Sequence, residues 1–318
     1  MDYVLAMVVS LLIALITMPF LIKLANKIHF TDKPNKRKQH KTATPLCGGI
    51  ALYIGFFISY FIFVTDDINI IKQITVFVAA TMIVVIGLID DWYKTKGKEF
   101  PIFPRLIIQL LAAILVFKAG IVFRGFTNPI TDNFIELNQT IQFLLTITWI
   151  FGVTTVINWS DGKDGLAGGL SLISAITFFL AAIILDQTGP ALVSIILVGT
   201  ILGFLYYNRF PAKVFMGDSG ANFLGFILSI TALDGAFKQT TVMSLFIPIL
   251  ALAVPIFDNL FVIIKRFLDG KPVYQADRSQ IHFRLEEKGF STVQVVNYIM
   301  LISLTFSAIS IALLFLKN

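Results

Sequence analysis

The stretch NIIKQITVFVAATMIVVIGLI, residues 69–89, decides the fold class. Its single charged side chain is Lys72, and pairs of aspartates flank it at 66–67 and 90–91. A helix that crosses a bilayer needs roughly 20 mainly apolar residues, which this stretch supplies. The strands of a membrane barrel would alternate in polarity, and this stretch does not. We therefore predict a membrane-spanning helix here.

Similar apolar runs recur along the chain and predict an all-α polytopic membrane protein. Only 14% of the residues are charged, whereas about 25% is usual in soluble domains. Proline, glycine and charge clusters separate the runs. We expect a single integral membrane domain, 1–318, with about ten transmembrane helices near 3–24, 48–65, 70–89, 104–120, 139–157, 166–185, 190–207, 220–237, 240–264 and 294–316.

The positions of lysine and arginine predict how the chain is threaded. With ten helices, twenty of the 25 basic residues fall on the side that carries segments 23–47, 90–105, 158–165, 208–219 and 265–293. Cytoplasmic loops carry the excess of basic residues, so this side is expected to be cytoplasmic and both termini outside. The net charge of +6 then reflects topology and contact with membrane lipids, and we expect no nucleic-acid partner.

The unusual polar motifs gather on the same side of the membrane. They are PNKRKQHKTATPLCGG (34–49), DDWYK (90–94), NWSDGKDGLAGG (158–169), NRFPAKVFMGDSG (208–220) and DRSQIHFRLEEK (277–288). A transporter usually keeps its essential carboxylates near the middle of the bilayer. Motifs at helix ends on one face instead favour an enzyme whose site opens to the cytoplasm.

Adjacent Asp90 and Asp91 are candidates for a base or an organiser of metal and phosphate. Adjacent carboxylates repel each other unless a cation lies between them, and Lys94 and Arg105 are near in sequence. These two cations would also neutralise an anionic phosphate. The alternative is a solvated helix cap.

Three further aspartates lie among glycines. Asp161 and Asp164 each precede a glycine, which lets the backbone approach a ligand closely, and the next helix offers free N–H groups to a phosphate. A plain capped loop is the alternative. Asp218 lies between Gly217 and Gly220, and we predict that it binds Mg²⁺, which prefers carboxylates and keeps substrate phosphates and waters as its other ligands.

The basic loop near the C-terminus predicts phosphate recognition. Arg278 and Arg284 carry forked donors that match phosphate oxygens, and His282 between them could donate to a pyrophosphate. Contact with anionic lipid headgroups is the alternative. Phe215 could stack on a base or simply pack. Asp258, inside a helix, is either functional or hydrogen-bonded to Asn259 or a neighbouring helix.

The five motifs occur in the order and spacing of polyprenyl-phosphate N-acetylhexosamine-1-phosphate transferases, the WecA/TagO group related to the MraY translocases. The chain resembles this family from about residue 20 to 300. The resemblance implies transfer of N-acetylhexosamine-1-phosphate, with GlcNAc preferred, from a UDP-sugar to undecaprenyl phosphate. The products would be undecaprenyl-pyrophosphoryl sugar and UMP, at the start of cell-wall or surface polysaccharide synthesis in a bacterial cytoplasmic membrane.

The resemblance also implies roles for individual residues. The acids assigned to catalysis are Asp90, Asp91 and Asp161. Asp218 and Asn158 match positions at the metal, which is Mg²⁺ or Mn²⁺. The residues assigned to substrate binding are Lys41, Lys94, Asp164, Asn208, Phe215, Arg278, His282 and Arg284. A one-step transfer and a covalent aspartyl-phosphate route need the same residues, and a homodimer is compatible with the resemblance.

Two departures from the family pattern bear on the substrate. Trp159 and Lys163 replace leucines of the usual N-L-x-D-G-L-D-G motif, and Lys163 could pair with Asp161 or Asp164. The loop that commonly reads H-I-H-H has a single histidine here, which leaves the sugar open. The remaining alternatives are a muramoyl-pentapeptide or deoxysugar nucleotide donor, a cation-coupled transporter, and a non-catalytic scaffold.

Overall fold

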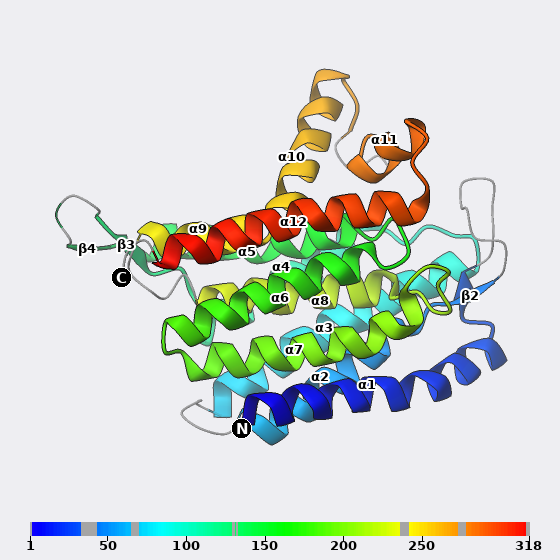
Figure 1. Cartoon of the computed structure of the whole chain (residues 1–318), viewed down its shortest axis with the longest axis horizontal. Helices are drawn as coiled ribbons and strands as arrows, with labels where there is room; N and C mark the ends of the chain where they lie inside the picture. The colour runs from blue at the N-terminus through cyan, green and yellow to red at the C-terminus, as the bar shows by residue number, and fades with distance from the viewer. Residues whose placement is uncertain are drawn as a thin grey trace.

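The protein is a bundle of long helices with a small projection at one side (Figure 1). This computed structural model describes residues 2–32, 43–64, 70–128, 131, 133–235, 242–272 and 278–315, without the side chains of 242–245. The longer helices are α1 (Asp2–Lys27), α2 (Gly48–Phe63), α3 (Ile70–Thr95), α4 (Ile102–Lys118), α5 (Gln139–Trp159), α6 (Leu166–Ile184), α7 (Thr188–Asn208), α8 (Gly217–Asp234) and α12 (Thr292–Phe315). The shorter ones are α9 (Val242–Ala251), α10 (Ala253–Leu268) and α11 (Ile281–Glu287).

The helical membrane class is confirmed for the part of the chain that the structure describes. Six helices there, α1, α3, α5, α6, α7 and α12, are long and apolar enough to cross a bilayer. The protein is therefore a multi-pass membrane protein. The ten-span count and the sides on which the termini lie stay predictions, although both ends of the described chain lie at the same end of the bundle (Figure 1).

Two short antiparallel strand pairs interrupt the expected all-α architecture. Strands β1 (Thr31–Asp32) and β2 (Thr44–Pro45) pair beside the first predicted cytoplasmic loop. Strands β3 (Gly125–Thr127) and β4 (Phe134–Glu136) pair between α4 and α5. Both pairs connect helices outside the apolar runs, where the sequence lacks helical periodicity, so they leave the class of the fold unchanged.

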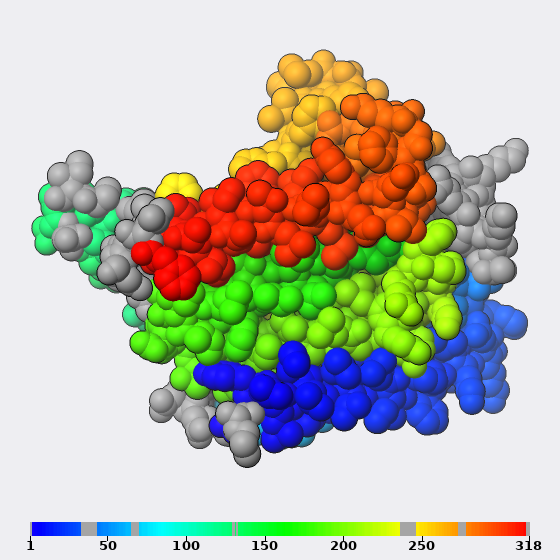
Figure 2. Space-filling view, viewed as in Figure 1, coloured from blue at the N-terminus to red at the C-terminus, as the bar shows by residue number. Residues whose placement is uncertain are grey.

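The segment 240–264, expected as one span, is not one continuous helix. Helix α9 ends at Ala251, and α10 begins at Ala253 and runs away from the bundle (Figure 1). Pro255 explains the break, because its ring lacks an N–H for the carbonyl of Ala251 and would collide with it in a continuous helix. In the first turn of a new helix, where N–H groups have no partner anyway, proline is tolerated. Figure 2 shows α10 and α11 as a projection beyond the bundle.

Helix α8 forms the centre of the bundle. Nearly every residue from Gly217 to Leu233 is buried, and α2, α3, α5, α6 and α7 all pack against the helix. Gly87 of α3 faces the backbone of Ser219 so closely that a side chain there would collide with it. The N-terminus of α8, which carries Asp218, is thereby pressed against the C-terminal turns of α3, which carry Asp90 and Asp91.

Candidate active site

Asp91 caps the N-terminus of α8. Its carboxylate accepts hydrogen bonds from Asp218 N at 2.8 Å, Ser219 N at 3.1 Å and Ser219 Oγ at 2.9 Å. The first N–H groups of a helix have no partner within it, and an acidic oxygen there satisfies them and complements the helix dipole. Gly217 takes a positive φ of 66°, and a side chain there would collide with the Asp91 carboxylate. Asp91 is fully buried, so its oxygens are committed to holding α8.

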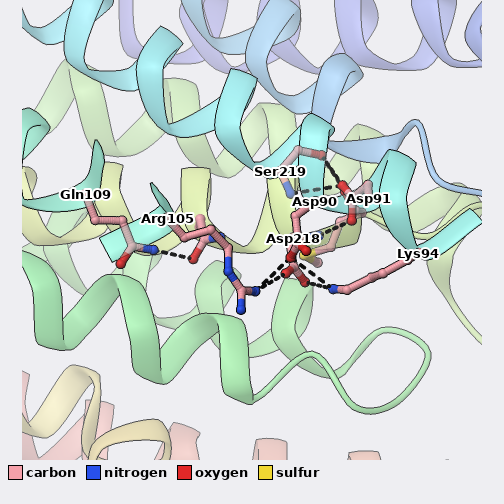
Figure 3. Close-up of polar contacts among 9 residues, drawn as sticks. Asp90, Asp91, Lys94, Arg105, Gln109, Asp218 and Ser219 are labelled. Carbon is pink, nitrogen blue, oxygen red and sulfur yellow. Dashed lines mark hydrogen bonds and ion pairs between the residues drawn. The ribbon is translucent and has the colours of Figure 1, made fainter. Parts of the chain in front are cut away.

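Asp90 belongs to a different group, a cluster of four charges (Figure 3). Arg105 of α4 donates to Asp90 Oδ2 at 2.8 Å and lies 3.4 Å from Asp218 Oδ2. Lys94 Nζ is 2.7 Å from Asp218 Oδ1 and 3.4 Å from Asp90 Oδ2. The two cations approach the acids from opposite sides in Figure 3. The sequence prediction that Lys94 and Arg105 lie beside the paired aspartates is therefore confirmed, and Asp218 joins them.

This cluster borders a cavity of about 540 Å³. Lys94 and Asp218 line it on one side, and the loop between α5 and α6 lines it on another. The residues around it come from six separate segments of the chain: Asp32, Leu46, Asp91, Lys94, Asp161, Gly162, Lys163, Asp164, Asn208, Phe210, Phe215, Gly217, Asp218, Arg278, Phe283 and Thr292. Six predicted site residues lie in this lining besides Asp91 and Phe215, and Lys41 falls outside the described residues.

Asp161 is the titratable group of the loop between α5 and α6. The close packing around its carboxyl raises its pKa to about 7, because a charge is poorly solvated there. The Asp218 carboxylate adds to the rise in pKa, and Lys94 opposes it. A carboxyl group whose pKa lies near neutrality can take up or release a proton during a reaction.

Asp164 and Asn208 join two loops of the cavity wall. Asp164 Oδ2 accepts from Ala212 N at 2.9 Å, and Asn208 Oδ1 accepts from Gly165 N at 3.0 Å. Asn208 Nδ2 donates to Val214 O at 2.8 Å. These bonds fix the loop that follows α5 against the loop that follows α7. Both residues were predicted for the nucleotide pocket; they do line the cavity, but much of their hydrogen-bonding capacity goes to the protein.

Phe215 also lines the cavity and is fixed by its backbone. Its N–H donates to Pro45 O at 2.9 Å, and its carbonyl accepts from Gly48 N at 3.0 Å. The half-buried ring therefore sits where β2 meets the start of α2. A ring held this way at a cavity wall can stack on a base, as the sequence motif predicted.

His282 is placed behind the cavity wall. It is buried, and Gly162 lies against its ring so closely that a side chain at 162 would collide with the imidazole. Burial and nearby Lys163 lower the His282 pKa to about 3, so the ring is neutral at physiological pH. Its Nε2 has no hydrogen-bond partner among the described residues. His282 does not itself line the cavity.

Arg284 is directed towards α10 and not into the cavity. Its guanidinium pairs with Asp258 at 3.0 Å and covers the ring of Phe261 at 4.3 Å. Both Asp258 oxygens also accept from Ile281 N, at 2.9 and 3.0 Å. The structural alternative for Asp258 is thus the one observed, although its partners are on α11 and not Asn259. Of the two arginines expected to hold pyrophosphate, Arg278 lines the cavity and Arg284 anchors α11.

Two site partners were not expected from the sequence. Lys163 pairs with Glu286 of α11, a partner outside its own loop. Glu286 lies in the quoted motif 277–288, but nothing in that motif distinguishes it from an ordinary exposed acid. Asp32, buried beside β2, also lines the cavity; its position four residues after the first helix could have marked it.

Asn158 lies in the last turn of α5. Its side-chain nitrogen is buried and has no partner among the described residues. Rotation of the Asn158 carboxamide group that exchanges its nitrogen and oxygen would place the oxygen at the same position. Within those residues no three histidine, cysteine or acidic side chains gather as a ready-made metal cage. Mg²⁺ rarely uses such a cage and is usually held by one or two carboxylates, waters and substrate phosphates, so Asp218 and Asn158 fit this ion.

Comparison with known proteins agrees with this geometry. Residues 73–236 match the model of the family described as glycosyl transferase family 4. A probable undecaprenyl-phosphate N-acetylglucosaminyl 1-phosphate transferase of Bacillus subtilis is 38% identical over 98% of this chain and 84% of its own length. A decaprenyl-phosphate N-acetylglucosaminephosphotransferase of Mycobacterium leprae is 33% identical over 87% of this chain and 75% of its own.

More distant members are similar over the same length. A phospho-N-acetylmuramoyl-pentapeptide-transferase of Desulforamulus reducens is 31% identical over 98% of this chain and 96% of its own length. The sequence resemblance to prenyl-phosphate phosphosugar transferases is confirmed by these relatives. The chain belongs to glycosyl transferase family 4.

Proposed function

We propose that this protein transfers GlcNAc-1-phosphate from UDP-GlcNAc to undecaprenyl phosphate, giving undecaprenyl-pyrophosphoryl-GlcNAc and UMP. The observation that carries the proposal is the cluster of Asp90, Lys94, Arg105 and Asp218 at the edge of a cavity of about 540 Å³. A cavity of this size is within the range that holds a nucleotide-sized ligand. The names of the first two relatives given above contain a polyprenyl phosphate and N-acetylglucosamine phosphate, the same classes of substrate.

The acceptor phosphate is assigned to Lys94 and Arg105. Each cation already pairs with two carboxylates. A phosphate that binds between the two cations would take the place of a carboxylate as their anionic partner. An oxygen of the lipid phosphate then attacks the β-phosphorus of the donor. The bond from that phosphorus to the bridging oxygen breaks, and the electron pair leaves with UMP. Asp90 orients the acceptor and accepts its remaining proton when the phosphate arrives as a monoanion.

The metal is assigned to Asp218 and Asn158, with Mg²⁺ as the natural ion and Mn²⁺ as a substitute. When bound, the ion spreads the charge that develops on the pyrophosphate, which is the main catalytic task in phosphoryl transfer. Asp91 keeps Asp218 at the end of α8 through the three hydrogen bonds described above. Its part in the reaction is thus positioning, and the catalytic role inferred from the motif passes to Asp90.

The donor is assigned to the far wall of the cavity. Phe215 offers its ring to the uracil, and Asp161, Asp164 and Asn208 line the pocket around it. Arg278 is the arginine of the C-terminal motif that reaches the cavity. Lys41 retains the nucleotide-binding role that the motif predicts.

The cavity is assigned to the cytoplasmic face of a bacterial cytoplasmic membrane, with ten crossings and both termini outside. The positive-inside distribution of lysine and arginine supports this orientation. UDP-sugars are soluble nucleotides of the cytoplasm, whereas the lipid acceptor lies in the bilayer. A site at the end of a helical bundle, where α3, α4 and α8 meet, gives both substrates access.

The test is release of UMP by the purified full-length protein from UDP-GlcNAc and undecaprenyl phosphate, with and without Mg²⁺. We expect release with the metal, and loss of at least about 100-fold in Asp90→Asn or Asp218→Asn, as is typical when a group that stabilises the transition state is removed. Asp269→Asn, at an exposed carboxylate beyond α10, is the control and should be fully active. No product from UDP-GlcNAc, with product from the muramoyl-pentapeptide or a deoxysugar nucleotide, would overturn the choice of donor.

A further inference from the structure

Helix α11 is tied to the loop between α5 and α6 by a buried ion pair. Lys163 Nζ lies 2.5 Å from Glu286 Oε1, and the two side chains are only 8% and 10% exposed. Gln280, just before α11, adds a hydrogen bond of 2.7 Å to the carbonyl of Trp159. Trp159 and Lys163 are the two residues that replace leucines of the related motif. Lys163 makes its contact with the C-terminal basic loop through its side chain, whereas Trp159 does so through its backbone carbonyl.

The ion pair lies next to the cavity wall formed by α11. Phe283 precedes Glu286 by three residues, so the two side chains share a face of the short helix. Lys163 lies over the Phe283 ring at 5.6 Å from its centre, and Arg278 lies over the same ring at 5.2 Å. Lys163, Arg278 and Phe283 all line the cavity. The position of this wall thus depends on where Lys163 is held.

We infer that Lys163 and Glu286 form a positioning pair that sets the donor-side wall of the cavity and thereby the affinity for the nucleotide sugar. This inference rests on the proposed function. Glu286 draws the ammonium of Lys163 to the α11 side of the loop, where it supports Phe283 beside Arg278. Without Glu286 the buried ammonium loses the charge partner it has on α11, and breaking a buried ion pair is strongly unfavourable. The nearest acids along the loop are then Asp161 and Asp164, two cavity residues whose charge it would neutralise.

The pair is tested by charge reversal in the full-length enzyme. Lys163→Glu and Glu286→Lys each place like charges in contact, and the double variant restores an opposite pair. Coupling between groups in direct contact makes us expect each single variant to raise the KM for UDP-GlcNAc about tenfold or more. The double variant should return to within about threefold of the wild type. The KM for undecaprenyl phosphate should stay within about twofold, because the acceptor is assigned to Lys94 and Arg105, which pair with Asp90 and Asp218 and not with Glu286.

Lys271→Glu is the matched control. Lys271 forms an exposed pair with Asp269, and exposed pairs contribute little, so its kinetic constants should equal those of the wild type. A reversed variant that fails to accumulate in the membrane is replaced by Glu286→Gln, which keeps the size of the side chain. An unchanged donor KM in the single variants would overturn the inference. So would single variants that raise both KM values equally, with no recovery in the double variant.

Binding of UDP without turnover separates this inference from the proposed function. Should the wild type release no UMP from UDP-GlcNAc, the proposed donor is wrong, but UDP titrated into the same purified proteins still reports on the pair. Weaker UDP binding in both single variants, recovered in the double variant, supports the positioning role. Equal UDP binding in all four proteins contradicts it.

Discussion

Replacement of Asp91 tests the division of labour between the two adjacent aspartates. Asp91→Ala leaves three donors at the N-terminus of α8 without their acceptor: Asp218 N, Ser219 N and Ser219 Oγ. An unsatisfied buried donor costs about 1–3 kcal/mol, and Ser219 Oγ retains Met216 O as an acceptor at 3.3 Å. The two backbone N–H groups should therefore account for a loss of roughly 2–6 kcal/mol of unfolding free energy. Asp91→Asn retains one acceptor oxygen, and with it one or two of the three bonds. Its loss should be about half as large.

The measurement is thermal unfolding in detergent beside the rate of UMP release. A loss of about 1 kcal/mol lowers Tm by roughly 2–4 °C in a protein of 150–250 residues, so Asp91→Ala should melt at least about 4 °C below the wild type. Asp90→Asn, whose partners are side chains at the partly exposed cluster, should lose activity with a change in Tm of only a few degrees. An Asp91→Ala protein that melts like the wild type would refute the capping argument, and Asp91 would return to the catalytic group.

Four further predictions concern other parts of the site. Below pH 6.5 His282 becomes protonated in the unfolded chain, whereas in the folded protein it is buried, has a pKa of about 3 and stays neutral. The free energy of unfolding therefore falls as the pH falls, by about 2 kcal/mol at pH 5. His282→Gln should show a correspondingly smaller drop in Tm between pH 7 and pH 5. Arg105→Gln should raise the KM for undecaprenyl phosphate about tenfold. Arg105→Lys, measured beside it, should show a smaller rise because a cation remains. Equal KM values in the two variants would contradict an electrostatic role. Chelation of divalent metal should stop UMP release, and added Mg²⁺ should restore it. Asp258→Asn should stay active but be cleaved more readily by proteases at α11, because Asp258 anchors α11 and has no role in transport.

The helices and the meeting of the acids could be predicted from sequence for a clear physical reason. In a bilayer the backbone must satisfy its own hydrogen bonds, so a long apolar run without strand-like alternation folds as a helix. The position of Asp90 and Asp218 at the ends of such runs places both at a helix terminus. The count of basic residues then predicts that these two helix ends lie on the same side of the membrane. The structure brings the two acids together with Lys94.

The partners chosen by each charge could not be predicted in the same way. Lys163 has acids two before it and one after it in sequence, yet it pairs with Glu286, because the choice depends on how α11 is folded back over the loop. Arg284 and His282 share a motif with Arg278, but a helical turn sends their side chains to Asp258 and to Gly162. The break before Pro255 was visible as a proline, although prolines inside membrane helices are often accommodated.

The committed position of Asp91 has a consequence for the biogenesis of the protein. Helix α3 leaves the ribosome long before α8 is made, and until residues 217–219 arrive the Asp91 carboxylate lacks the donors that hold it in the finished protein. A nascent chain that ends before residue 217 must keep this end of α3 in contact with water or headgroups. Insertion of α8 is then the event that draws it inward, and the charge cluster can assemble only once α8 has been made.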